Sequence, residues 1–387
     1  MLDNIACPKF RKLCSNCGKF YPEEMAVCVQ DMQMLITIDW DEQSDLLENW
    51  LARSKFFGSK HCLRCNRHYR KITESFCPED GNVLERCVHD EPEGPILDKR
   101  FQLKSYVATG RLSRVYYAVD VETQAPRIVK FLKPGLSADE RTVARYLRVS
   151  KAAIELQHPN IVRTYAAGKT ESGAPYVVTQ YLAGQSLRDE LLKRNKLDPA
   201  SALSIFIDLA RGLQYAHANN VMHTNLTPSN VYIIQKGERP SAMIVDFGAA
   251  QRLFRHTDWQ RGQAESESDA DTENVYGDPL GICPEFITGS RPSFQSDIYQ
   301  VGCCLYESLN GRPPFSRNRT MATIMAHAKD QPDDFEPGVN DMMKSLTLEC
   351  LKKNPEERFQ TATELRYVLE ECRKELTGSP YVERSIS

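Results

Sequence analysis

Hydrophobic and polar positions follow different patterns in different parts of the chain. Residues 39–56 (DWDEQSDLLENWLARSKF) place two tryptophans and three leucines on one side of a helical pattern, which predicts one amphipathic helix. Residues 101–131 are typical of strands, whereas the longer stretch after them is mainly helical, with one helix expected within Ala144–Leu156. The most apolar run, Val301–Leu309, contains Glu307 and is far too short to cross a bilayer. The pattern therefore predicts a chain whose larger part is built from strands followed by helices.

Composition favours a soluble protein of two or three domains. The chain has 387 residues, of which 41% are hydrophobic and 26% charged, and its formal net charge is -3 at pH 7. This charge argues against nucleic acid or an anionic membrane as the main partner. The first ten residues (MLDNIACPKF) lack the apolar core of a secretion signal, so we expect a cytoplasmic protein.

Cysteines are concentrated near the N-terminus, where eight of the thirteen lie within the first hundred residues. They form an internal repeat, in which a Cys-x-x-Cys pair is followed by a third cysteine and, three residues later, by an aspartate. Such groups present thiolates to one tetrahedral zinc ion, and a fragment of this size relies on the ion in order to fold. The predicted ligands are Cys14, Cys17, Cys28 and Asp31 in the first copy, and Cys62, Cys65, Cys77 and Asp80 in the second.

The fourth ligand of each predicted site stays open. A carboxylate is an acceptable zinc ligand, but Cys7, Cys87, His61, His68 or His89 could replace either aspartate. The alternative is a set of reduced structural cysteines without metal. A closed shell of four ligands would make both zinc sites structural rather than catalytic. The pattern resembles zinc ribbons, which are small β-hairpin modules.

The rest of the chain carries a series of motifs in a fixed order. They are His158-Pro159-Asn160-Ile161-Val162, His223-x-x-Leu226-x-Pro228-x-Asn230, Asp246-Phe247-Gly248, Pro284-Glu285, Ser296-Asp297-Ile298-Tyr299-x-x-Gly302, Gly311-x-Pro313-Pro314-Phe315 and Arg358. No single motif is decisive, but seven at the right intervals leave little room for chance. Together they resemble the protein kinase family, in particular bacterial serine/threonine kinases of the eukaryotic (Hanks) type. The resemblance implies a bilobal α+β fold.

The resemblance also implies a nucleotide site that is partly altered. The glycine-rich loop of kinases, G-x-G-x-x-G-x-V, reads ATGRLSRV in this chain, so Gly110 and Val115 are kept while two glycines are replaced. Lys130 corresponds to the lysine that contacts the ATP phosphates. Three nearby positions depart from the family pattern: Ile128 replaces a small residue against the adenine, Tyr232 replaces an aliphatic pocket floor, and Val149 replaces the glutamate that pairs with the lysine.

The expected catalytic loop has lost its acid–base group. The family pattern H-R-D-L-x-x-x-N appears as HTNLTPSN, so Asn225 stands in place of the aspartate that accepts the substrate's hydroxyl proton. An amide cannot act as a base near neutral pH. Thr227 replaces a lysine that steadies the transferred phosphate, and Thr224 replaces an arginine that reads phosphorylation of the activation loop. On the substrate platform, Asp278 replaces a threonine and Gly281 an aromatic residue.

Other kinase positions are kept. Asn230 and Asp246 correspond to the two Mg²⁺ ligands, so the resemblance leaves room for bound ATP with Mg²⁺ even without catalysis. Glu285 and Arg358 correspond to a buried ion pair of the large lobe. Asp297 corresponds to the carboxylate that binds the backbone of the catalytic loop. A lobe that keeps these supports is expected to fold normally.

These patterns predict a pseudokinase that acts as a signalling scaffold or regulator by binding a protein partner, such as an active kinase or its substrate. One alternative is a weakly active or unconventional ATP-dependent serine/threonine kinase. A third is a zinc-ribbon regulator that binds nucleic acid, which the net charge disfavours; a membrane partner is not expected. The predicted parts are a zinc ribbon (1–38), a helical connector (39–60), a second ribbon (61–90), a linker (91–96), the kinase-like domain (97–376) and a tail (377–387).

Overall fold

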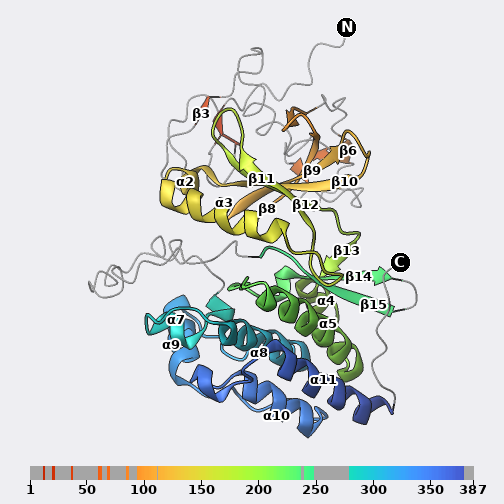
Figure 1. Ribbon diagram of the computed structural model, residues 1–387, viewed down its shortest axis with the longest axis vertical. Helices are drawn as coiled ribbons and strands as arrows, with labels where there is room; N and C mark the ends of the chain where they lie inside the picture. Colours follow the sequence, from red (N-terminus) through yellow and green to blue (C-terminus); the bar gives the residue numbers. More distant parts are fainter. Residues whose placement is uncertain are drawn as a thin grey trace. The chain divides into compact units, whose positions relative to one another are not determined.

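The computed structural model describes residues 94–110, 112–236, 239–247 and 279–378, together with the backbone of six short strands before residue 94 (Figure 1). The helix expected over 39–56, Asp278 and the side chains of the eight predicted zinc ligands lie outside the described residues. The chain divides into two units. The first is Met1–Leu147 with Tyr165–Tyr181, and the second is Arg148–Thr164 with Leu182–Ser387.

The six short strands form two antiparallel three-stranded sheets with the same strand order, β2-β1-β3 and β5-β4-β6. Each strand of the second sheet begins 48 residues after its counterpart in the first. The repeat in the cysteine pattern is therefore accompanied by a repeat of the backbone. The strands are β1 (Lys12–Leu13), β2 (Phe20–Tyr21), β3 (Ile36–Thr37), β4 (Lys60–Cys62), β5 (His68–Tyr69) and β6 (Leu84–Arg86).

A six-stranded sheet with the order β11-β12-β10-β9-β8-β7 is the main element of the first unit. Alternate side chains of β9 are buried, and Tyr116 at its centre lies edge-on to Tyr106 and Phe131 with ring centroids 5.6 and 5.7 Å away. The prediction of strands over 101–131 is confirmed. The strands are β7 (Ile96–Leu97), β8 (Phe101–Thr109), β9 (Ser113–Asp120), β10 (Pro126–Leu132), β11 (Thr164–Lys169) and β12 (Pro175–Gln180).

A short helix, α2 (Pro134–Ser137), and a longer one, α3 (Glu140–Ile154), follow β10. α3 begins four residues before the segment in which it was expected and ends two residues earlier. The early start has a local cause, because the carboxylate of Asp139 accepts hydrogen bonds from the amide of Arg141 (3.2 Å) and the hydroxyl of Thr142 (2.6 Å).

The second unit is mainly helical and is organised around α5 (Pro199–Ala218), which lies against α8 and α11 (Figure 1). Asp198 caps α5 by accepting from the amide of Ser201 at 2.9 Å. Among the described residues, no helix is long and apolar enough to cross a membrane. The other helices are α4 (Leu187–Arg194), α7 (Pro284–Ile287), α8 (Phe294–Asn310), α9 (Thr320–Lys329), α10 (Asp341–Cys350) and α11 (Ala362–Thr377).

A small antiparallel sheet, β13 (Gly184–Ser186), β14 (Val231–Lys236) and β15 (Arg239–Ile244), completes the second unit. Together, a β-sheet unit followed by a helical unit confirms the α+β, kinase-like fold that the motifs predicted.

Candidate active site

The expected catalytic loop connects α5 to β14 in the second unit. It runs from His223 into a single 3₁₀ turn, η2 (Pro228–Asn230), which leads directly into β14. Pro228 is the first residue of that turn, where a missing N–H leaves no hydrogen bond unmade. The loop sequence HTNLTPSN contains no carboxylate.

Asp297 of α8 fixes the first half of this loop. Its carboxylate is fully buried and accepts from the amides of His223 (2.8 Å) and Thr224 (2.7 Å). His217 of α5 binds the same carboxylate through Nε2 at 2.8 Å. Thr224 has a φ of 64°, a left-handed conformation that costs a β-branched residue about 1–3 kcal/mol. The hydrogen bonds from Asp297 therefore hold a strained backbone in place.

Both ring nitrogens of His223 form hydrogen bonds. Its Nδ1 accepts from the amide of Asn225 (3.3 Å), so Nε2 carries the proton and donates to the carbonyl of Val245 (2.8 Å). Burial lowers the pKa of His223 and keeps the ring neutral. Asn225 itself offers an amide in place of a base. Within the loop, neither a carboxylate nor an available imidazole stands where the resemblance predicts a proton acceptor.

The two predicted Mg²⁺ ligands are held close together by the backbone. The amide of Val245 donates to the carbonyl of Asn230 (3.0 Å), and Asp246 is the next residue. The side-chain nitrogen of Asn230 donates to the carbonyl of Asn225 (2.9 Å), so its amide oxygen is the atom left for a ligand. Amide and carboxylate oxygens are the ligands that Mg²⁺ prefers, so the two side chains have the chemistry that such an ion requires.

Gln300 of α8 joins the loop to the 3₁₀ turn η5 (Pro279–Gly281), which belongs to the segment expected to form the substrate platform. Its side chain is 3% exposed; Oε1 accepts from the amide of Leu226 (2.8 Å), and Nε2 donates to the carbonyls of Thr224 (3.1 Å) and Gly281 (3.2 Å). Sequence reasoning missed this residue. The available signal was an amide side chain directly before the apolar run Val301–Leu309.

A small cavity of about 10 Å³ lies beside Gly281, where the resemblance predicts an aromatic ring. Residues of the loop, the platform and α8 line it, including Thr227, Cys303 and Glu307. A methyl group on Gly281 would lie 3.6 Å from the carbonyl oxygen of Leu226 and 3.8 Å from Thr227, which is ordinary contact. The cavity has space for about one water molecule.

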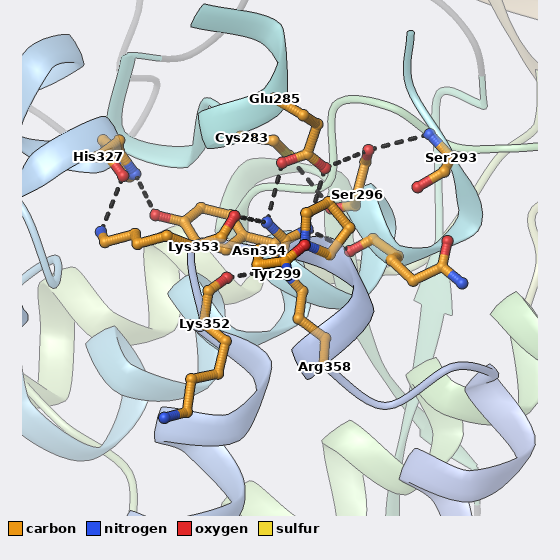
Figure 2. Close-up of polar contacts among 12 residues, drawn as sticks. Cys283, Glu285, Ser293, Ser296, Tyr299, His327, Lys352, Lys353, Asn354 and Arg358 are labelled. Atoms are coloured by element: carbon orange, nitrogen blue, oxygen red, sulfur yellow. Dashed lines mark hydrogen bonds and ion pairs between the residues drawn. The ribbon is translucent and has the colours of Figure 1, made fainter. Parts of the chain in front are cut away.

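Behind the platform, Arg358 and Glu285 form the expected buried ion pair, with two hydrogen bonds of 2.9 Å (Figure 2). The remaining three donors of the guanidinium bind the carbonyls of Lys352, Lys353 and Gln295, so all five are used. Burial opposes the charge of Arg358, but its hydrogen bonds and its attraction to Glu285 outweigh this and raise its pKa.

A second buried group lies beside this pair (Figure 2). The hydroxyl of Tyr299 lies 2.9 Å from Nδ1 of His327, and the ammonium of Lys353 donates to the carbonyl of His327 (2.8 Å) while lying 4.0 Å from the centroid of Phe315. Burial lowers the pKa of His327 to about 3 and that of Lys353 to about 8. His327 and Lys353 connect α9 to the residues around the Glu285–Arg358 ion pair. The sequence analysis did not identify either residue.

The predicted nucleotide-binding residues of the first unit lie along one hairpin and the strand beside it. Lys130 on β10 lies directly opposite Val115 on β9. Gly110 lies in the turn between β8 and β9, where its amide donates to the carbonyl of Ser113 (2.8 Å). The hydroxyl of Tyr146 on α3 donates to the carbonyl of Lys130 (3.3 Å). Gly110, Val115 and Lys130 therefore belong to the first unit, whereas Asn225, Asn230 and Asp246 belong to the second.

The position expected to hold the glutamate partner of the lysine is apolar and buried, because Val149 on α3 is 8% exposed. Glu155, one residue beyond the end of α3, is exposed. Among the residues that the structure describes, no group of three or more His, Cys, Asp and Glu side chains could hold a metal ion. The predicted zinc ligands lie outside those residues.

Comparison with known proteins agrees with the fold. The family described as "Protein kinase domain" matches residues 101–368. The serine/threonine-protein kinase PknB of Mycobacterium leprae is 31% identical over 278 residues, which cover 70% of this chain and 43% of that protein. The probable serine/threonine-protein kinase SCO3848 of Streptomyces coelicolor is 31% identical over 290 residues, which cover 73% of this chain and 41% of that protein. This chain thus matches less than half the length of either relative.

Solved structures show the same architecture. The kinase domain of Mycobacterium tuberculosis PknI matches with a TM-score of 0.54 and 20% sequence identity, covering 71% of this chain and 96% of that one. At this identity the likeness concerns the fold alone. The motifs, the two-unit architecture and these matches together establish that the chain belongs to the protein kinase domain family, with bacterial serine/threonine kinases among its relatives.

Proposed function

We propose that this chain is a pseudokinase, a kinase-fold protein that acts through binding rather than through phosphoryl transfer. The observation that carries the proposal is Asn225, an amide in place of the proton-accepting carboxylate, in a loop whose buried supports are all present. General-base catalysis contributes about 10²–10⁴-fold to an enzyme's rate. Thr227 adds to the loss, because it replaces a cation that would steady the transferred phosphate.

Buried contacts of the second unit explain how such a chain remains folded. The supports around Asp297 and the Glu285–Arg358 pair are internal to the second unit and involve neither nucleotide nor substrate. They would hold the loop and the turn at Pro279–Gly281 whether or not chemistry takes place. A protein partner, which we propose to be an active kinase or the substrate of one, would recognise this preformed surface.

Nucleotide binding is compatible with the residues that remain. Lys130 would contact the phosphates, and the amide oxygen of Asn230 with the carboxylate of Asp246 would hold Mg²⁺. In kinases the Mg²⁺–ATP complex supplies the phosphoryl group that is transferred. In this chain, we propose that these three residues are retained to bind and orient a nucleotide that biases conformation.

We further propose that the N-terminal repeat forms two structural zinc ribbons, joined to the kinase domain by the linker near 91–96, in a protein of the cytoplasm. The support is the pair of three-stranded sheets with the same order and a spacing of 48 residues, which accompanies the repeated cysteine pairs. The zinc content of purified protein, measured by atomic absorption, tests this part. Two zinc ions per chain are expected, and a metal-free folded chain would contradict it.

The main test is a phosphotransfer assay with labelled ATP, Mg²⁺ or Mn²⁺ and generic protein acceptors. The wild-type chain is expected to transfer no phosphate above the level of Lys130→Met. Transfer by the wild type that disappears in Lys130→Met would instead identify an unconventional kinase. A thermal-shift titration with ATP and Mg²⁺ separately tests nucleotide binding, since ligand at 100 times its Kd stabilises by about 2.7 kcal/mol.

A further inference from the structure

Helix α3 carries a row of basic side chains along its exposed side. Arg141, Arg148 and Lys151 are exposed, and Arg145, which is half-buried, lies in the same row. The side chains of Arg141, Arg148 and Lys151 have no ion pair or hydrogen bond among the residues described by the structure. We call these four residues the α3 stripe.

Arginines of the other described helices behave differently. Each of them binds a partner on its own or a neighbouring element, most often a carboxylate. The pairs are Arg188 with Glu307, Arg194 with Glu190, Arg211 and Arg366 with Glu370, and Arg373 with the hydroxyl of Ser204. α3 is therefore the described helix whose exposed arginines are left without a counter-charge.

The stripe is unfavourable for the helix that carries it. Arg148 and Lys151 are three residues apart, so two like charges lie next to each other along the surface. Arg141 also lies in the first turn, where the helix dipole disfavours cations. Helix stability alone thus gives no reason for this arrangement, whereas binding of an anionic partner would relieve both effects.

The surroundings of the stripe leave it accessible. Small side chains lie beside the arginines, because Ala144 and Ala152 are both exposed. The opposite side of α3 is buried through Val143, Tyr146 and Ala153, so the helix is anchored and presents the stripe outward. From Arg141 to Lys151 the stripe extends about 15 Å along the axis, given a rise of about 1.5 Å per residue. Guanidinium groups bind carboxylates through two parallel hydrogen bonds, which favours an acidic protein segment as ligand.

We propose that the α3 stripe is a docking surface for an acidic segment of a partner protein, in which several carboxylates follow one another over about 15 Å. This inference goes beyond the loss of catalysis and does not depend on it, because the stripe shares no residue with the catalytic loop. Docking there would place carboxylates against Arg141, Arg148 and Lys151.

The test uses the full chain and a fluorescein-labelled peptide of alternating glutamate and serine, with binding followed by fluorescence anisotropy. The triple variant Arg141→Ala, Arg148→Ala, Lys151→Ala is expected to bind about tenfold more weakly than wild type at low salt. A matched control, Arg291→Ala, Arg319→Ala, Lys329→Ala, removes the same charge from exposed positions elsewhere and is expected to retain the wild-type affinity. A peptide with glutamine in place of glutamate is expected not to bind.

Thermal unfolding separates docking from a structural role. The α3 triple variant is expected to unfold at the same temperature as wild type or higher, because it removes repulsion within the helix. Equal affinity of the wild type and the triple variant would overturn the proposal, as would an equal loss in the control or no binding of the acidic peptide. Tighter binding of duplex DNA, lost in the same triple variant, would identify a nucleic-acid surface and overturn it as well.

Discussion

The two sides of the catalytic loop differ in what they have kept. On the buried side, Asp297 and Gln300 bind four backbone groups of His223, Thr224 and Leu226, and each of these contacts lies between 2.7 and 3.1 Å. On the side where transfer chemistry takes place in kinases, Asn225 and Thr227 are neutral. The comparison separates two sets of side chains: those of α8, which hold the loop backbone, and those of the loop itself, which the kinase resemblance assigns to chemistry. We expect that the loop side chains can change while the contacts from α8 keep the fold.

The largest effect is expected from the buried ion pair behind the platform. Glu285→Ala leaves the guanidinium of Arg358 buried without its counter-charge and is expected to lower the free energy of unfolding by about 3–5 kcal/mol. The control is Asp333→Ala, which breaks an ion pair with Arg312 that is half exposed on both sides and should cost no more than about 1 kcal/mol. Denaturant titration measures both. Similar costs for the two variants would mean that the framework is not what stabilises this unit.

Acid is expected to destabilise the same part of the second unit by protonating the buried His327. Burial, with a smaller effect of the nearby Lys353, lowers the pKa of His327 to about 3 from an ordinary 6.5. The pKa of His327 is lower in the folded protein than in the unfolded chain. The stability that the neutral ring contributes is therefore complete above pH 6.5 and is lost as the pH falls from 6.5 to 3. We expect a loss of about 2–4 kcal/mol over that range in wild type and a shallower loss in His327→Gln. Parallel pH profiles of the two proteins would contradict this.

A further test compares the stability of a variant on the supporting helix, α8, with that of a variant in the loop itself. Asp297→Asn weakens the hydrogen bonds that the carboxylate accepts from the amides of His223 and the strained Thr224, and is expected to cost about 1–3 kcal/mol. Asn225→Asp lies on the chemical side and should change stability by no more than about 0.5 kcal/mol. Thermal unfolding of both variants gives the comparison directly. A large destabilisation by Asn225→Asp would show that the two sides are not separate.

The smallest effect is expected at the cavity beside the platform. Gly281→Ala adds a methyl group in ordinary contact distance and reduces the freedom of the unfolded chain, so we expect it to stabilise by about 0.4–1 kcal/mol. Gly302→Ala is the matched control on α8, because its methyl would lie 2.6 Å from Cβ of Cys350 and should destabilise by about 1–3 kcal/mol. Equal unfolding temperatures for the two variants would rule out this description of the cavity.

Much of the fold followed from the sequence, because ordered motifs carry long-range information. The pairing of Glu285 with Arg358, and of Asp297 with the loop, was expected from residues up to 74 positions apart and is present in the structure. The strands over 101–131 were expected from their local pattern. These features depend on residue type at fixed spacing, which a single sequence displays.

Other features could not be predicted because they depend on packing. Gln300 and His217 reach the loop region from α8 and α5, and nothing in their local pattern indicates which backbone groups or carboxylate they bind. The early start of α3 depends on a cap at Asp139 that a periodicity count does not include. The cavity beside Gly281 arises from what neighbouring elements leave unfilled. The zinc ligands stay a prediction.

The most direct test of the central claim is phosphotransfer from labelled ATP by wild type, Asn225→Asp and Asn225→Asp combined with Lys130→Met. If the missing carboxylate limits an otherwise supported loop, the wild type transfers no phosphate, and any activity that Asn225→Asp gains is lost with Lys130→Met. Transfer by the wild type itself, removed by Lys130→Met alone, would contradict the account.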